Sequence, residues 1–246
     1  MTSVRGYRIL ANFCCGARFS SPSYGSINFT AYEYWTDGQR VHSLAPTDGG
    51  LRRCTCGAYF LLRNTIDIGF EETQETPSAI YVRDDELASL LALPMKEDIE
   101  LIVRRRYWRH LNDPYREIYR AHRKTVDDAV KAANKGAATF WRMLGRKLLG
   151  TKPPVPTAVV HLTRIFTVPP YSATEVQREN MHVLLIMLLS SEKPDPLEIA
   201  ELYRELENYD EALKVIEKID EAEHVGSKLI RQLITERVNE PMRYRA

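Results

Sequence analysis

Two short stretches of this 246-residue chain share one pattern of cysteine, glycine and phenylalanine: FCCGARF at residues 13–19 and CTCGAYF at residues 54–60. Each contains the sequence Cys-Gly-Ala-X-Phe, which begins at Cys15 in the first stretch and at Cys56 in the second. A glycine directly after a cysteine adopts a positive φ easily, and this turns backbone amides toward the sulfur atom. The repeat is therefore typical of two zinc knuckles, the paired loops that hold one metal ion.

The spacing of the cysteines departs from the usual C-x-x-C knuckle. That spacing would place the first ligands at positions 12 and 53, which are Asn12 and Arg53, whereas the additional thiols belong to Cys14 and Cys54. Adjacent side chains of an extended segment point to opposite faces. Cys14 and Cys15 can therefore share one tetrahedral ion only if the backbone bends sharply between them.

Three arrangements of the cysteines remain open. The first is a distorted four-cysteine zinc site with the ligands Cys14, Cys15, Cys54 and Cys56. The second is a three-cysteine site completed by a residue such as His42, and the third is a knuckle fold without metal that keeps small buried thiols. Clustered cysteines in a reducing compartment favour metal or free thiols over disulfides. Any zinc would be structural, because paired knuckles fill all four positions of the ion.

The fold class that the sequence predicts is α+β, with a small N-terminal β unit followed by an all-helical region. Residues 24–60 are rich in aromatic residues and threonine, and Asp37-Gly38 is the dipeptide of a tight hairpin turn. Residues 66–79 are acidic and threonine-rich and are expected to form a linker. Expected helices follow at 83–93, 95–111, 115–149 and 174–191, with Thr174 as an N-cap, and three shorter ones lie after residue 196.

Three regions are expected from these signals. They are a zinc-ribbon-like β unit at 1–70, a helical region with a basic helix at 71–150, and a helical region with a tetratricopeptide-like hairpin at 151–246. The boundary between the last two falls in GTKPPVP, residues 150–156, where three prolines break the helical pattern.

The order of the motifs resembles that of a known group of proteins. The motifs are CCGARF, YEYWTDGQRVHSL, RRCTCGAYFLL, RRRYWRHLNDPYRE and the stretch at residues 179–220. They are similar to bacterial proteins of undetermined function that combine an N-terminal zinc-ribbon-like unit with a C-terminal helical part similar to tetratricopeptide repeats. The likeness covers most of the chain, except residues 121–173. It implies that fold and a knuckle metal site, and it brings no activity with it.

Residues 196–220 compare with a single tetratricopeptide unit. Ala200 and Ala212 allow its two helices to approach closely, while Glu207 occupies the turn where a glycine is usual. Stacked repeats need roughly three units for stability, and only one is clear here. The hairpin is therefore expected either to bind peptides or partner proteins or to serve as the core of a helical domain.

A basic, aromatic-rich stretch at residues 104–124 gives an alternative function. Its candidate phosphate-binding residues are Arg104, Arg105, Arg106 and Arg109. Arginine interleaved with aromatic residues is typical of a surface for single-stranded nucleic acid. The same arginines can instead pair inside the protein, because residues 104–147 hold 13 basic and 4 acidic residues and residues 192–223 hold 12 acidic and 4 basic ones.

The leading functional hypothesis is a non-catalytic adaptor or scaffold that binds an unidentified protein partner. A formal net charge of +1 predicts no global attraction to nucleic acid or membrane. The longest apolar run, residues 183–189, is too short to span a bilayer, and the absence of a secretory signal predicts a cytoplasmic location. An enzyme of unrecognised class, for example with a Cys14–His42 dyad, is the third hypothesis, since no known catalytic motif is present.

Overall fold

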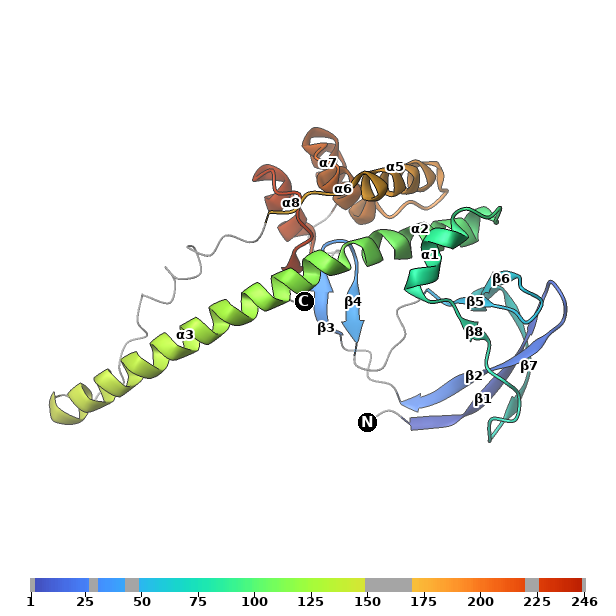
Figure 1. Ribbon diagram of the computed structural model, residues 1–246, viewed down its shortest axis with the longest axis horizontal. Helices are drawn as coiled ribbons and strands as arrows, with labels where there is room; N and C mark the ends of the chain where they lie inside the picture. The colour runs from blue at the N-terminus through green and yellow to red at the C-terminus, as the bar shows by residue number, and fades with distance from the viewer. Residues whose placement is uncertain (1–2, 27–30, 43–48, 149–169, 220–225, 245–246) are drawn as a thin grey trace. The chain divides into compact units, whose positions relative to one another are not determined.

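The computed structural model describes residues 3–26, 31–42, 49–148, 170–219 and 226–244. It divides into two compact units, of which one combines Met1–Asn112 with Ser172–Ala246 and the other is Asp113–Tyr171. The second unit contains α3 (Asp113–Leu148), a single long helix in Figure 1 that confirms the helix expected at 115–149. The proline-rich boundary at 150–156 lies outside the described residues.

In its described residues, the first unit is a mixed α/β structure with three small antiparallel sheets and a set of helices. Its strands are β1 (Ser3–Asn12), β2 (Arg18–Ser26), β3 (Ala31–Trp35), β4 (Arg40–His42), β5 (Leu51–Arg53), β6 (Tyr59–Leu61), β7 (Thr65–Glu71), β8 (Ile80–Tyr81) and β9 (Arg243–Tyr244). Its helices are α1 (Leu87–Leu90), α2 (Glu97–Leu111), α5 (Glu175–Ser190), α6 (Pro196–Glu205), α7 (Tyr209–Ile216) and α8 (Ser227–Thr235), with short 3-10 helices η1 (Leu62–Asn64) and η2 (Asp84–Glu86). The predicted order of a β region followed by helices is confirmed.

Two β-hairpins carry the repeated cysteine loops. β1 and β2 flank residues 13–17, and β5 and β6 flank residues 54–58. The equivalent phenylalanines of the two repeats, Phe19 and Phe60, are buried together in one small apolar core. The two hairpins therefore pack against each other through the same position of the repeat, and this brings their loops together.

The stretch predicted to be a linker, residues 66–79, begins instead with a strand. β7 pairs with β1 at one edge of the sheet, whose strand order is β2-β1-β7. Ile66, Ile68 and Phe70 recur with the period of two that is typical of strands. The linker prediction is wrong for this part of the stretch, because the acidic and polar residues between the apolar ones concealed the alternation.

The hairpin predicted around Asp37-Gly38 is confirmed. β3 and β4 pair on either side of this turn, and Gly38 has a φ of +76°. The Asp37 side chain is buried and accepts a hydrogen bond from Asn112 at the end of α2, and the same amide group of Asn112 donates to Glu205 of α6. A buried polar network therefore joins the hairpin to α2 and α6. Strand β9, which the sequence did not predict, pairs with β3.

The first helix is shorter than the one predicted at 83–93. Only η2 and the four-residue α1 form there, and the next turn ends before Pro94, which disfavours the helical conformation in the residue that precedes it. Leu87 and Leu90 of α1 lie in a core cluster with Leu51 of β5 and Val103 of α2. This cluster fixes α1 and α2 against the sheet of the second cysteine hairpin.

Helix α5 begins as predicted, because Thr174 and Gln177 form a capping box at its N-terminus. Figure 1 shows α6, α7 and α8 gathered together, and their apolar residues share one buried cluster that includes Ala200 and Ala212. The chain leaves α6 through Glu207 at a φ of +63°, which confirms the unusual position of this glutamate. None of the helices in the described part of the chain has the length and apolar character needed to cross a membrane.

Candidate metal centre

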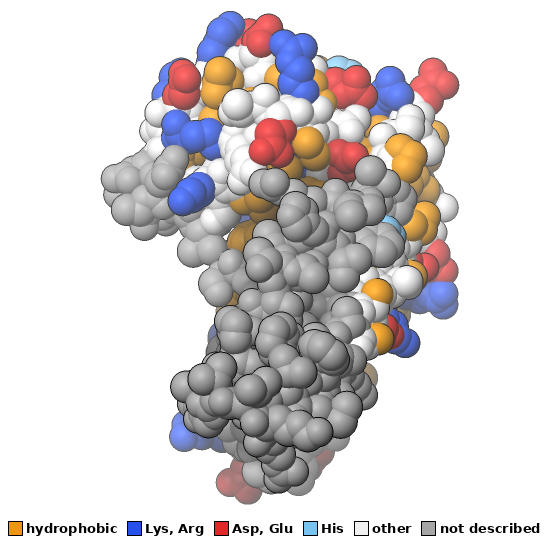
Figure 2. Space-filling view, turned by 90° about the vertical axis from the view of Figure 1, so that its left-hand side faces the viewer, with side chains coloured by type: hydrophobic (Ala, Val, Ile, Leu, Met, Phe, Trp, Pro, Cys, Tyr) orange, Lys and Arg blue, Asp and Glu red, His pale blue; other side chains and the backbone are white. Residues whose placement is uncertain are grey.

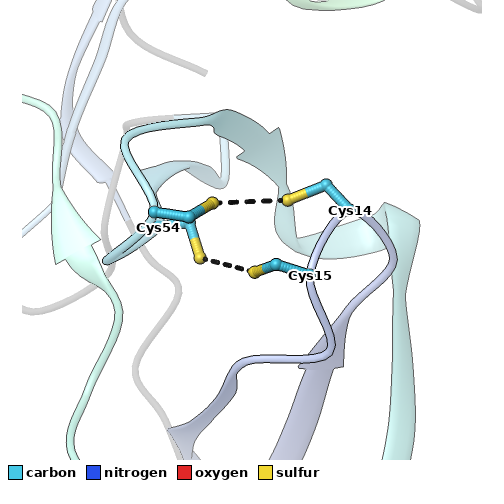
Figure 3. Close-up of side chains that lie close together, drawn as sticks. Cys14, Cys15 and Cys54 are labelled. Carbon is cyan, nitrogen blue, oxygen red and sulfur yellow. Dashed lines mark hydrogen bonds between the residues drawn. The ribbon is translucent and has the colours of Figure 1, made fainter.

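The thiol groups of Cys14, Cys15, Cys54 and Cys56 form one cluster, in which all four Sγ atoms lie within 4.8 Å of one another. Two sulfur–sulfur contacts connect the loops. The Sγ atoms of Cys14 and Cys56 are 3.6 Å apart, and those of Cys15 and Cys54 are 3.4 Å apart. Figure 3 shows Cys14 and Cys15 pointing from their loop toward the other loop, on which Cys54 is labelled. The structure thus brings together all four cysteines that the sequence proposed as ligands.

These separations match the size of a tetrahedral metal site. Four sulfur atoms at about 2.3 Å from a zinc ion lie about 3.8 Å from one another in a regular tetrahedron. A disulfide would require about 2.05 Å, and all four cysteines are free thiols. The cluster can therefore hold one metal ion with only small movements of its side chains.

Tight turns bring the adjacent cysteines to one side of their loop. The backbone turns over residues 13–15, which provides the sharp bend that shared coordination by Cys14 and Cys15 requires. Gly16 and Gly57 follow the last cysteine of each loop with φ values of +67° and +89°, a region that favours glycine. The glycines of the repeat thus have the conformation that the sequence predicted.

The environment of the cluster favours a thiolate at Cys54. Burial opposes its ionisation, but the backbone amide of Cys56 and the side chains of Cys15 and Asn12 together lower the pKa of the Cys54 thiol to about 6. The backbone amide of Ala17 stabilises a thiolate at Cys15, yet the hydrogen bonds of that thiol to its neighbouring cysteines raise its pKa to about 12. The Cys15 and Cys54 sulfur atoms share a hydrogen bond of 3.4 Å in which either can be the donor, and a metal ion would replace the shared proton.

His42, the proposed alternative ligand, is not part of the cluster. It lies on β4, in the sheet β4-β3-β9 rather than in either cysteine hairpin. Within the described parts of the chain, the four cysteines are the one group of histidine, cysteine and acidic residues arranged to hold a metal ion. The four-cysteine arrangement is thus the one that the geometry favours, and the Cys14–His42 dyad gains no support.

A groove of about 1040 Å³ runs beside the cysteine loops. One wall comes from the loops and from Tyr59 and Phe60, and the other comes from α1, α2 and the segment between them. The lining is mainly apolar, and two of its side chains, Phe13 and Leu93, are 72% and 52% exposed. Sequence reasoning missed this groove, since it forms only when the second cysteine hairpin packs on α1 and α2.

The four arginines of the nucleic-acid alternative all have partners inside the protein. Arg104 contacts Glu100, Arg105 contacts Glu198, Arg106 contacts Asp84, and Arg109 donates to the backbone oxygen of Asp37. The Arg105 guanidinium makes two hydrogen bonds to Glu198, of 2.5 and 2.7 Å, and so joins the basic α2 to the acidic α6. In the face drawn in Figure 2, basic and acidic side chains are interspersed over the described surface. We therefore do not propose this helix as a nucleic-acid surface.

Fold and site together define a protein with a four-cysteine cluster between two β-hairpins, followed by helices. No family model, curated protein or solved structure matches the chain. Function is accordingly inferred from the geometry of the cluster and of the groove beside it.

Proposed function

We propose that this protein is a non-catalytic adaptor that binds a partner protein and carries one structural zinc ion. The observation that carries the proposal is the convergence of four thiols from two hairpins within 4.8 Å. Four sulfur ligands in a tetrahedron are typical of zinc and leave no position for a substrate. The ion therefore acts by holding the two loops together.

The groove beside the cluster supports the adaptor role. One of its walls belongs to the two cysteine loops that the ion would hold together, so the metal would fix the shape of that wall. Phe13 and Leu93 expose large apolar surfaces at this groove, and such surfaces are typical of sites where proteins bind one another. We propose that a partner protein inserts apolar side chains between these two residues.

We propose a supporting role for the tetratricopeptide-like hairpin. Ala200 and Ala212 are fully buried where α6 and α7 meet, which agrees with the close helix approach of that repeat. One helical pair makes little concave surface. The hairpin therefore stabilises the helical part, and partner binding is assigned to the groove.

Site-specific cross-linking tests this function. A photoreactive amino acid at Leu93 in the metal-loaded full chain is expected to capture a defined protein in cells of the native host. The matched control carries the same amino acid at Ile186, which is 66% exposed on α5 and lies outside the groove. Capture at Leu93 is expected to weaken when Phe13→Asp places a charge in the groove and when Cys56→Ser removes a metal ligand.

Two results would contradict the proposal. The same proteins captured from both positions would show that the groove has no specific partner. Elemental analysis of the purified chain that finds less than about a tenth of an equivalent of zinc would remove the metal from the proposal, because a structural site binds its ion tightly.

A further inference from the structure

The second cysteine loop is closed by two backbone hydrogen bonds that both involve Cys54. Its amide donates to the carbonyl oxygen of Ala58 at 2.8 Å, and its carbonyl oxygen accepts from the amide of Gly57 at 2.9 Å. Cys54 is therefore the first ligand of its loop in sequence and also the residue at which the loop closes.

In the first loop, Asn12 makes the same two bonds. Its amide donates to the carbonyl oxygen of Ala17 at 3.0 Å, and its carbonyl oxygen accepts from the amide of Gly16 at 2.8 Å. Ala17 and Gly16 are the counterparts of the alanine and glycine that bond to Cys54 in the other repeat. Asn12 thus stands where Cys54 stands, and the first loop is longer by one residue.

The side chains extend this equivalence. Asn12 Oδ1 accepts a hydrogen bond of 3.3 Å from the amide of Cys14, two residues along. Asn12 and Cys54 are 4% and 5% exposed. Asn12 Nδ2 is a buried donor that has no hydrogen-bond partner among the described residues.

We propose that Asn12 occupies the first-ligand position of a knuckle and acts as a positioning residue of the metal centre. Its Oδ1 fixes the turn that delivers Cys14 to the ion, and its side chain fills the buried position that a first cysteine ligand would occupy. Because the first loop has one extra residue, its first cysteine ligand is at position 14 and not at position 12. Asparagine at position 12 keeps the two backbone hydrogen bonds that the first ligand makes in the second loop. This inference rests on the proposed metal site and assigns a role to a residue that is not a ligand.

Moving one cysteine from position 14 to position 12 tests whether position 12 is equivalent to the position of Cys54. Cobalt(II) is the probe, because its charge-transfer and ligand-field bands report how many thiolates are bound. The full native chain is expected to give a four-thiolate spectrum, and Cys14→Ser is expected to lose the intensity of one thiolate. The double variant Asn12→Cys with Cys14→Ser creates a C-x-x-C spacing with Cys15 and is expected to regain the four-thiolate spectrum. A double variant that keeps the spectrum of Cys14→Ser alone would overturn the proposed equivalence.

Metal affinity tests the positioning role separately. Asn12→Ala is expected to weaken zinc binding by about 10- to 100-fold, as is usual when a group that orients metal ligands is lost. Asn12→Ser is expected to recover part of that loss, because a serine hydroxyl can also accept from the amide two residues along. The control Asn64→Ala removes another amide that lines the neighbouring groove and is expected to leave the affinity unchanged.

The outcomes separate this inference from the proposed function. A native chain that binds neither zinc nor cobalt(II) contradicts the metal site itself. A native chain that binds zinc with the same affinity as Asn12→Ala contradicts only the role of Asn12. Thermal unfolding of Asn12→Ala and of the native chain, each with and without metal, completes the test. A purely structural role of Asn12 would lower the unfolding midpoint of Asn12→Ala even without metal. A positioning role lowers that midpoint only when metal is present.

Discussion

The rings of Phe19 and Phe60 lie with their centroids 5.0 Å apart and their planes at 46° to each other. The two residues hold the same place in the two cysteine repeats, four residues after Cys15 and Cys56. Their contact joins the two hairpins below the loops, and the cysteine cluster joins the same hairpins at the loops. The repeat therefore specifies both an apolar contact and a ligand set between one pair of hairpins.

Replacement of Phe60 by alanine is expected to destabilise the β region strongly. The ring is 6% exposed, and a buried phenylalanine truncated to alanine costs about 3 kcal/mol or more of the free energy of unfolding. Urea unfolding of the metal-loaded chain measures the loss. Phe13→Ala is the control, since its ring is 72% exposed and its loss is expected to change the free energy of unfolding by less than about 0.5 kcal/mol. Similar losses for both variants would show that the two hairpins do not depend on the Phe19–Phe60 contact.

Oxidation of the metal-free chain is expected to form two specific disulfides, Cys14–Cys56 and Cys15–Cys54. These are the pairs whose sulfur atoms lie 3.6 and 3.4 Å apart, so each needs only a small movement to reach bonding distance. Peptide mapping after treatment with a mild thiol oxidant identifies the pairs, and bound zinc is expected to slow the reaction. Disulfides within one loop, Cys14–Cys15 or Cys54–Cys56, would contradict the arrangement of the cluster.

The cysteine repeat predicted the site because its requirements are local. A glycine after each second cysteine sets the turn, and the shared phenylalanine sets the contact, so both could be read from residues 13–19 and 54–60. The bend between Cys14 and Cys15 could not be read in the same way. The bend lies in a loop to which Asn12 makes three hydrogen bonds, and a template based on cysteine spacing treats Asn12 only as a missing ligand.

Features that depend on distant parts of the chain were not predicted. Strand β9 has two residues and pairs with β3, from which it is separated by most of the sequence, so no local pattern identifies it. The sequence could assign the ion-pair partner of Arg105 only to an acidic region of the chain. The structure shows that the partner is Glu198. Local patterns therefore identified the helices and the cysteine loops, while long-range pairing determined the groove and the polar network.

Glutamine in place of Glu205 is expected to make stability less dependent on pH. Glu205 is buried, with one carboxylate oxygen bonded to Trp108 and Asn112 and the other without a partner among the described residues. Burial raises the pKa of Glu205 well above its usual value, and the charges of Glu201 and Asp37 raise it further. The folded chain therefore keeps this proton at pH values where the unfolded chain, with a glutamate pKa of about 4.3, releases it.

The sign of the effect follows from this difference. Because the folded state binds more protons, stability falls as the pH rises above about 4.3 toward the raised pKa of the folded state. Glutamine resembles the protonated acid, so the variant is expected to gain stability over the native chain across this range and to keep the gain at neutral pH. Unfolding free energies measured between pH 4 and pH 7.5 check the trend, with Glu217→Gln at an exposed position as the control. A native chain that becomes more stable than the variant as the pH rises would contradict the buried, protonated state of Glu205.

Glycine at position 207 is expected to stabilise the helical part. Glu207 has a φ of +63°, and the amide of Asn208 bonds to the carbonyl oxygen of Tyr203 at 2.8 Å, which is the Schellman ending of a helix. A non-glycine residue in this left-handed region costs about 1–2 kcal/mol. Part of this gain is lost in Glu207→Gly, because glycine has more conformational freedom in the unfolded chain. The variant is therefore expected to raise the free energy of unfolding by about 1 kcal/mol.

Two further variants test whether the stability change at position 207 comes from its backbone conformation. Arg237 ends α8 at a φ of +53°, so Arg237→Gly is expected to stabilise the chain in the same way. Glu217 ends α7 at a φ of −64°, which suits any residue, so Glu217→Gly is expected to destabilise the chain by about 0.5–1 kcal/mol. Thermal and denaturant unfolding of the three variants measure these opposite signs. Loss of stability in Glu207→Gly together with a gain in Arg237→Gly would mean that the Glu207 side chain, which accepts a hydrogen bond from Asn239, outweighs the strain of its backbone. Loss of stability in all three would contradict the prediction.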